Sequence, residues 1–276
     1  TGLVTTTRIT HATPAAAYAH TVDRDWEADF DVGPEARAAG CSDIALQMIE
    51  GPVGRRLDVI LGGGRRMFLP TNAADPEYKD KRGVRTDGRN LIETWQKSTR
   101  GRYIWNTKGF AALDPARDRR VLGLFEPDHM HYEADRSADR AGEPSLAQMT
   151  RTAINIVRTN PKGFVLLIEG GRIDHAHHDG NARRALEDTV AFDNAVRVAL
   201  ETADPRDTLV VVTSDHSHAF TISGYPTRAN PVLGVVADPH NKPIQARDGR
   251  PYTTLGYANG PGAVTVSPRP DPSAED

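Results

Sequence analysis

Cysteine is almost absent from this chain of 276 residues, and it is the first of several scarcities that exclude whole classes of protein. Cys41 is the single cysteine, so the chain cannot build a disulfide framework of its own. Long apolar runs are missing as well, and none approaches the ~20 residues that a membrane-spanning helix needs. The net charge is only −3, so no excess of one sign indicates nucleic acid or an acidic membrane surface as a partner.

The remaining composition is that of a globular protein, with 38% hydrophobic and 26% charged residues, long enough for one large domain or two small ones. Short apolar runs predict buried strands. The two later runs are almost continuously β-branched or leucine-rich, a pattern typical of a parallel sheet covered on both faces. The predicted strands are Gly2–Thr6, Leu57–Leu61, Phe164–Ile168 and Thr208–Thr213.

Helical patterns fill intervals between these strands. One helix is predicted over Ser145–Val157, and another over Asn181–Leu200, where apolar residues recur at spacings of three and four. The alternation of strand and helix predicts an α/β fold, a doubly wound and mostly parallel sheet with helices on both faces. We expect one domain over residues 1–266 with an irregular excursion, a small subdomain, over 71–145, and a loose tail over 267–276.

The densest cluster of metal-ligating side chains follows the third predicted strand. Glu169 ends that strand, and ligands of open α/β sheets bind beyond the carboxyl ends of strands. Asp174 and His178 are four residues apart, so one helical turn places both on the same face, where they can hold one ion. A carboxylate and imidazole set favours zinc, and Glu169 as an oxygen donor suits magnesium. His175 and His177 are either supporting residues or merely exposed.

A second cluster follows the fourth predicted strand in the same way. Asp215 and His216 are adjacent, and His218 lies two residues further on. One Asp-His pair is weak support for a metal site, but two such clusters at two strand ends indicate ions brought close together. That arrangement is typical of two-metal phosphoryl transfer.

Two further groups contain histidine. His11 and Thr13 follow the first predicted strand, with Arg24 nearby as a candidate bidentate clamp for a phosphate. On spacing alone this group is an ordinary loop. His129 and His131 follow no predicted strand end, and we interpret them as part of a solvated loop.

Six segments, taken together in their order and separations, resemble the alkaline phosphatases, and the likeness extends from residue 1 to about residue 262. The most specific are IEGGRIDHAHH and DHSH. The region around LFEP resembles the animal-type branch of the family, which has an additional metal site there. The six segments are TTTRITHATPAAAYAHTVDR, LDVILGGGRR, LFEP, IEGGRIDHAHHDG, TSDHSHAF and YANGPGA.

This resemblance implies a hydrolase of phosphate monoesters that works through a phosphoserine intermediate and uses two zinc ions. By the family's pattern, Asp174 and His178 hold the first zinc ion. Asp215 and His216 hold the second, and His218 lies near the zinc pair in some members.

The resemblance also implies a magnesium ion and a structural calcium-like ion. Glu169 and Thr13 contribute to the magnesium site, with His11 beside it, and Arg24 matches the family's phosphate-binding arginine. The implied ligands of the calcium-like ion are Glu77, the Phe125 carbonyl, Glu126 and Glu143.

Other parts that the family uses lie outside this sequence. The nucleophilic serine belongs upstream of Thr1, and a third histidine ligand of the first zinc belongs downstream of Asp276, so we expect a partial sequence that is a poor catalyst alone. The resemblance further implies that Cys41 pairs with a cysteine outside this chain. It implies that the complete protein is a homodimer, located in the periplasm, outside the cell or at the cell surface.

Two alternatives stay open. The chain could come from a sulfatase or phosphodiesterase of the same superfamily, which the identity of the nucleophile would reveal. It could instead be a non-catalytic metal-binding module, which tight binding of ions without turnover would reveal.

Overall fold

The computed structural model describes residues 1–258, and the chain divides into two compact units. The first unit comprises Thr1–Arg172 and Asp188–Val212, and the second comprises Ile173–Glu187 and the part that begins at Thr213. The division differs from the single domain that we expected over residues 1–266. The predicted loose tail, residues 267–276, lies outside the described residues.

The first unit is built on a five-stranded parallel sheet, which confirms the predicted fold class. The strand order is β3-β4-β2-β1-β5, so the first strand of the chain lies inside the sheet, between β2 and β5. Three of the four predicted strands are present, with boundaries shifted by one or two residues. The five strands are β1 (Gly2–Arg8), β2 (Val59–Gly63), β3 (Arg102–Ile104), β4 (Val121–Leu124) and β5 (Leu166–Glu169).

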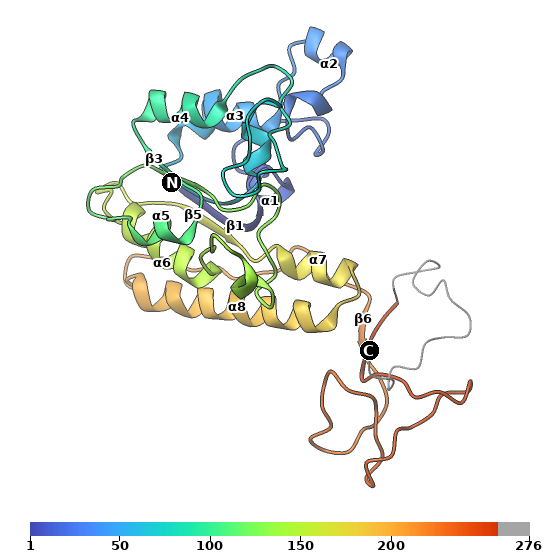
Figure 1. Ribbon diagram of the computed structural model, residues 1–276. Coiled ribbons are helices and arrows are strands. Elements are labelled where there is room, and N and C mark those ends of the chain that lie inside the picture. Colours follow the sequence, from blue (N-terminus) through green and yellow to red (C-terminus); the bar gives the residue numbers. More distant parts are fainter. Residues whose placement is uncertain (259–276) are drawn as a thin grey trace. The chain divides into compact units, whose positions relative to one another are not determined.

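Each face of the sheet is covered by its own hydrophobic core, because side chains alternate along a strand. In β1, Leu3 belongs to one core and Val4 to the other. The Leu3 core is closed by α3 (Ile44–Glu50) and α4 (Leu91–Thr99). Helices α5, α6 and α8 close the other, so the sheet is doubly wound (Figure 1).

Both predicted helices are confirmed. Helix α6 (Leu146–Val157) has Ser145 as its N-cap, and the Ser145 hydroxyl accepts the backbone N–H of Gln148 while the Gln148 side chain accepts that of Ser145. Helix α8 (Ala182–Thr202) covers the second predicted span. The remaining α-helices are α1 (Ala12–Ala16), α2 (Pro34–Ala38), α5 (Thr107–Ala111) and α7 (Arg172–His178).

Shorter elements complete the description. The second unit contains an antiparallel pair, β6 (Phe220–Ile222) and β7 (Leu255–Tyr257). The 3-10 helices are η1 (Asp29–Asp31), η2 (Gly54–Arg56), η3 (Arg65–Phe68) and η4 (Arg136–Ala138). No helix among the described residues is both long and apolar enough to cross a bilayer.

Two expectations about local structure are wrong. The segment 71–145 is not an irregular excursion throughout, because it supplies β3 and β4 to the main sheet. The predicted strand Thr208–Thr213 does not form, and it has no ladder partner among the described residues. Its apolar side chains stay in solvent, with Leu209 87% and Val211 75% exposed, so the apolar run that predicted a buried strand is not buried.

The parallel arrangement gathers the carboxyl ends of the strands at one edge of the sheet. Glu169 is the last residue of β5, and Phe125 and Glu126 directly follow β4. At the end of β2, a Cβ atom on Gly63 would come within 2.2 Å of the Asp128 carbonyl oxygen, and Gly64 adopts φ 93°. Gly63 leaves room for that oxygen because it has no Cβ atom, and Gly64 adopts the positive φ without steric cost. The loop that carries Glu126 can therefore approach β2 closely.

Candidate metal centres

Two buried threonine hydroxyls fix the carboxylate of Glu169 at the end of β5. The Thr5 hydroxyl donates to Glu169 Oε2 at 2.5 Å and the Thr7 hydroxyl to the same oxygen at 3.2 Å. Both threonines are fully buried, and Thr5 pairs with Glu169 in the ladder. A Cβ atom on Gly171 would lie 2.4 Å from Thr7 Cγ2, so the glycine lets the chain leave the strand over these groups. The sequence placed Glu169 at a strand end but did not identify its threonine partners.

The group after β1 forms short helix α1, which contacts both β1 and β5. His11 is its N-cap residue, and Arg24 Nη2 lies 3.1 Å from His11 Nε2. Burial lowers the pKa of His11, the nearby Arg8 lowers it further, and the charge of Glu169 acts in the opposite direction. Thr13 is exposed in the same helix. The arrangement brings the Arg24 guanidinium and the His11 ring together.

His129 is more tightly held than the solvated loop that we predicted for it. Its Nδ1 accepts the backbone N–H of Arg8 at 3.1 Å, and its Nε2 lies 2.7 Å from Arg8 Nη1. The ring packs edge-on against that of His11, with centroids 5.2 Å apart. The interpretation as a solvated loop was wrong because Arg8, on β1, fixes a residue that follows β4.

In the second unit, three histidines converge on one carboxylate. Asp174 Oδ1 lies 2.7 Å from His218 Nε2 and 3.5 Å from the Nε2 atoms of His178 and His216. Asp215, exposed in the loop, has Oδ2 3.4 Å from His216 Nε2. All five residues were predicted as zinc ligands or neighbours. The structure brings Asp174, His178, His216 and His218 together, whereas the contact of Asp215 is with the adjacent His216. Asp174, His216 and His218 offer ligand atoms within 4.8 Å of one another.

A ring stack orients His218 toward Asp174. The His218 ring stacks on that of His177 at a centroid distance of 4.8 Å and an interplanar angle of 25°. His177 Nδ1 lies 2.9 Å from the Tyr257 hydroxyl, which anchors the stack to β7. Burial lowers the pKa of His177, and His218 lowers it further. The supporting position of His177 is one of the two alternatives that the sequence left open.

A separate cluster of carboxylates lies in the first unit beyond β4. Ligand atoms of Glu77, Glu126 and Asp139 lie within 4.8 Å of one another, and so do those of Glu126, His131 and Glu143. The His131 backbone N–H donates to Glu143 Oε1 at 2.9 Å. Three members of this acidic cluster were predicted from the resemblance. Asp139 and His131 were not, because no spacing pattern connects their loop to Glu77.

Charge repulsion and burial act together on the acidic cluster. Burial raises the pKa of Glu126 to about 8, with Glu143 and Glu77 contributing, and burial together with Asp139 raises that of Glu77 to about 7. The hydrogen bond to Glu143 raises the pKa of His131 to about 9. Both Asp139 carboxylate oxygens and Glu143 Oε2 are buried without a hydrogen-bond partner. Such buried oxygens fit a hard divalent cation, which would satisfy them and remove the repulsion.

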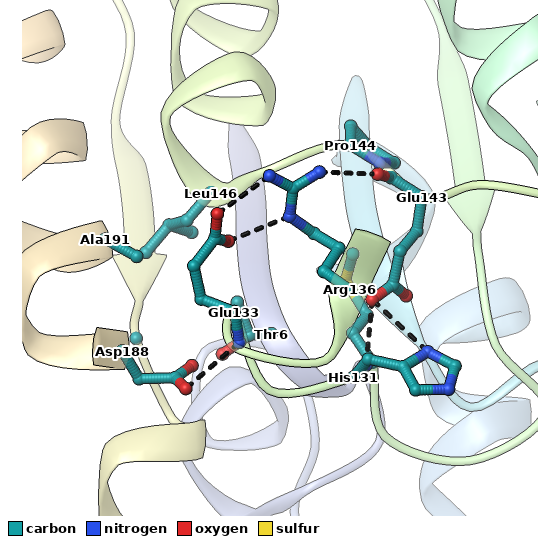
Figure 2. A pocket seen from close by; sticks show the side chains of 11 residues that line it. Thr6, His131, Glu133, Arg136, Glu143, Pro144, Leu146, Asp188 and Ala191 are labelled. Atoms are coloured by element: carbon teal, nitrogen blue, oxygen red, sulfur yellow. Dashed lines mark hydrogen bonds and ion pairs between the residues drawn. The ribbon is translucent and has the colours of Figure 1, made fainter. Parts of the chain in front are cut away.

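A narrow pocket lies beside this cluster (Figure 2). Arg136 closes one side by donating to both carboxylate oxygens of Glu133, at 2.8 and 2.7 Å, and to the Glu143 carbonyl oxygen at 3.3 Å. The cavity measures about 10 Å³, so it is no larger than one water molecule needs. Its size excludes a substrate, and Arg136 serves to position the loop that carries Glu143.

Comparisons with known proteins point to one family. A family model described as alkaline phosphatase matches residues 1–276. The human tissue-nonspecific alkaline phosphatase is 47% identical over 273 residues, which cover 96% of this chain and 50% of the human protein. The alkaline phosphatase of Gadus morhua is 45% identical over 272 residues, with 96% and 55% coverage. The chain therefore spans about half the length of the curated relatives it matches.

Solved structures give the same result. A variant of alkaline phosphatase from the Antarctic bacterium TAB5, crystallised with magnesium bound, superposes with a TM-score of 0.61 and 26% identity over 93% of this chain and 60% of that one. The Thermus thermophilus alkaline phosphatase superposes with a TM-score of 0.55 and 32% identity over 71% of this chain and 34% of that one. The match over the full sequence, with the doubly wound sheet and the carboxylate and histidine clusters, leads to one conclusion: this chain belongs to the alkaline phosphatase family.

Proposed function

We propose that this chain carries most of the metal-binding residues of an alkaline phosphatase whose complete form hydrolyses phosphate monoesters through a phosphoserine intermediate. The observation that carries the proposal is the convergence of His178, His216 and His218 on Asp174 Oδ1. One carboxylate oxygen and several imidazole nitrogens at such short separations are the donor set that zinc prefers.

The proposed zinc ligands all lie in the second unit. Asp174 and His178 would hold one zinc ion, and Asp215 and His216 the other, with His218 beside them. When bound, zinc supplies Lewis-acid stabilisation of charge on phosphoryl oxygens. The stack on His177 and Tyr257 fixes the ring of His218, so that its Nε2 faces Asp174.

The proposed magnesium ligands lie in the first unit. The hydroxyls of Thr5 and Thr7 hold one oxygen of Glu169, which fixes the orientation of a carboxylate that would bind the ion with Thr13, His11 lying beside it. Arg24 is exposed next to His11, and its guanidinium would bind two phosphate oxygens in a fork. In this role it steadies the charge that accumulates on those oxygens during transfer.

The acidic cluster would hold a structural calcium ion. Glu77, Glu126 and Glu143 are proposed ligands together with the Phe125 carbonyl, and the buried oxygens of Asp139 add a donor to that set. We further propose that the complete protein is a homodimer that works outside the cytoplasm, with Cys41, which is exposed here, forming a disulfide with a residue beyond this chain.

Hydrolysis of p-nitrophenyl phosphate at alkaline pH with zinc and magnesium tests the proposal. The 276-residue chain is compared with a version extended at both ends, and each is also made as Asp215→Ala. We expect turnover only from the extended version, and a loss of at least a hundredfold in Asp215→Ala.

The matched control is Asp207→Ala, which removes an exposed carboxylate that precedes the same segment. Turnover of this variant should stay within twofold of the unchanged extended version. If the extended version binds metals but cleaves a sulfate ester or a phosphate diester instead, the superfamily is right and the family's activity is wrongly assigned. If it binds zinc tightly and cleaves none of these, the chain is a metal-binding module.

A further inference from the structure

A second cavity of the first unit, about 470 Å³ in volume, lies at the edge of the sheet opposite the carboxyl ends. Arg102 is the first residue of β3, and Arg120 directly precedes β4. The two segments lie side by side, since the Arg102 backbone N–H donates to the Arg120 carbonyl at 2.9 Å. Because the strands are parallel, this amino-terminal edge faces away from the edge that carries Glu126 and Glu169.

Arginine dominates the lining of this basic cavity. Asp118 is the one carboxylate among the described residues that line it, so the cavity has a clear excess of positive charge. The carboxyl end of α4 reaches the cavity with a partial negative charge, which several guanidinium groups outweigh. The arginines are Arg100, Arg102, Arg117, Arg119 and Arg120.

Two of these arginines, Arg102 and Arg120, are fixed by hydrogen bonds to other parts of the protein. Arg102 Nη1 donates to Asp118 Oδ2 at 3.0 Å and to the Ala112 carbonyl at 2.9 Å. Arg120 Nη2 donates to the backbone carbonyls of Arg55 and Leu57. Arg102 and Arg120 therefore have fixed positions, which makes the shape of the cavity a stable property of the sheet edge.

The other arginines are exposed and available. Within residues 1–258, the Arg100 and Arg119 guanidiniums make no hydrogen bond or ion pair, and Arg117 has only a 3.5 Å pair with Asp114. Three exposed guanidinium groups on one cavity repel one another unless an anion lies between them.

Arg100 occupies a backbone position that favours glycine. It caps the carboxyl end of α4 with φ 57° and ψ 22°, in the left-handed region, and its N–H donates to the Gln96 carbonyl at 2.8 Å. Residues with a Cβ atom adopt this conformation at an energetic cost. The turn alone therefore does not account for an arginine here, whereas a role for its side chain in the cavity does.

We propose that the basic cavity binds a compact polyanion that carries several sulfate or phosphate groups. Guanidinium groups bind the oxygens of both anions through paired N–H donors. A volume of about 470 Å³ is in the range of small-molecule sites and far exceeds the needs of a single anion. None of the residues that line the cavity belongs to the proposed catalytic or metal-binding set.

Calorimetric titration of the 276-residue chain with myo-inositol hexasulfate tests the proposal, because this probe has no phosphate ester to hydrolyse. We expect one molecule bound per chain, with affinity falling as salt rises. Arg100→Gln combined with Arg119→Gln should weaken binding by at least tenfold. The charge-matched control, Arg37→Gln with Arg247→Gln, removes two exposed arginines elsewhere and should change affinity by less than twofold.

A second variant separates loss of the site from loss of the fold. Arg100→Gly relieves the left-handed strain, so it should raise the unfolding temperature while weakening binding. Equal weakening in the control pair, or undiminished binding in the Arg100 variants, would overturn the proposal, and so would loss of binding in Asp174→Ala alone. A parallel titration with myo-inositol hexakisphosphate identifies the preferred anion, and similar affinities for both probes also support the shared chemistry.

Discussion

Asp188 is a buried carboxyl group with an unusual environment. It is 5% exposed, and its Oδ2 accepts the backbone N–H of Glu133 at 3.1 Å. Burial raises its pKa to about 7, the charges of Glu133 and Asp135 act in the same direction, and Arg172 opposes them. Since the folded state holds the proton more tightly than the unfolded state, the effect of Asp188 on stability depends on pH.

The sign of this dependence follows from the two pKa values. Below about pH 4 the carboxyl is protonated in both states, and between pH 4 and 7 the unfolded state loses its proton first, so stability falls as pH rises. Asp188→Asn removes the penalty and keeps an acceptor for the Glu133 N–H. We expect the variant to exceed the unchanged chain in free energy of unfolding by about 4 kcal/mol at pH 8, since about three pKa units correspond to that much, and to match it near pH 4.

Urea unfolding at the two pH values measures this difference. Asp193→Asn is the control, because Asp193 is exposed on the same helix. An Asp188→Asn gain that is equal at pH 4 and pH 8 would contradict the assignment, since only a titrating group changes its contribution between them.

At the scale of elements, α6 has the most complete signals in its sequence. Ser145 and Gln148 form the reciprocal cap, and one face of the helix enters the core through Met149 and Ala153. These signals are local, so both the start and the end of α6 could be predicted. The strands were predictable for the same reason wherever an apolar run is buried, as in β2.

Ser145→Ala removes the hydroxyl that accepts the Gln148 N–H at 3.2 Å. We expect a loss of about 1 kcal/mol in the free energy of unfolding, measured in urea, because the amide is left without its acceptor. Ser137→Ala, an exposed serine of η4, should change stability by less than half of that amount. If both variants lose the same amount, the cap does not stabilise α6.

Sequence reasoning failed at elements whose structure depends on distant partners. β3 has three residues and β4 four, too short for a reliable pattern, and each is held in the sheet by pairing with a neighbouring strand. The reverse error occurred at Thr208–Thr213, where a strong apolar pattern finds no ladder partner among the described residues. An apolar pattern indicates that a segment can form a strand. The strand forms only where a neighbouring strand pairs with it.

At the scale of the whole molecule, the metal clusters were predictable to different extents. Glu169 and the Asp174 motif could be found because each follows a recognisable strand or helix signal. Asp139 could not, because its approach to Glu77 depends on two loops that meet only in the folded chain. The position of Asp139 therefore needed the structure, whereas Glu126 was named from the family resemblance alone.

The calcium ion proposed for the acidic cluster should stabilise the molecule as a whole. After treatment with a chelator, adding calcium should raise the unfolding temperature by about 5 °C, because binding to the folded state alone adds about 2–3 kcal/mol at a hundredfold excess over Kd. Asp139→Asn should lose at least half of this rise. Differential scanning calorimetry measures it, with the exposed Asp80→Asn as control. A full rise in Asp139→Asn would remove Asp139 from the ligand set.

Thr5 and Glu169 are in contact although they lie 164 positions apart in the sequence. Thr5 belongs to β1, and Glu169 belongs to β5 at the edge of the sheet. At a synthesis rate of ~5–20 residues per second, roughly 10–30 s pass between the synthesis of β1 and that of β5, its second neighbour in the sheet. Until then β1 has one exposed edge, and the threonine hydroxyls have no carboxylate to hold. The edge that carries Glu169 is therefore completed late in biosynthesis, after most of the first unit has already been synthesised.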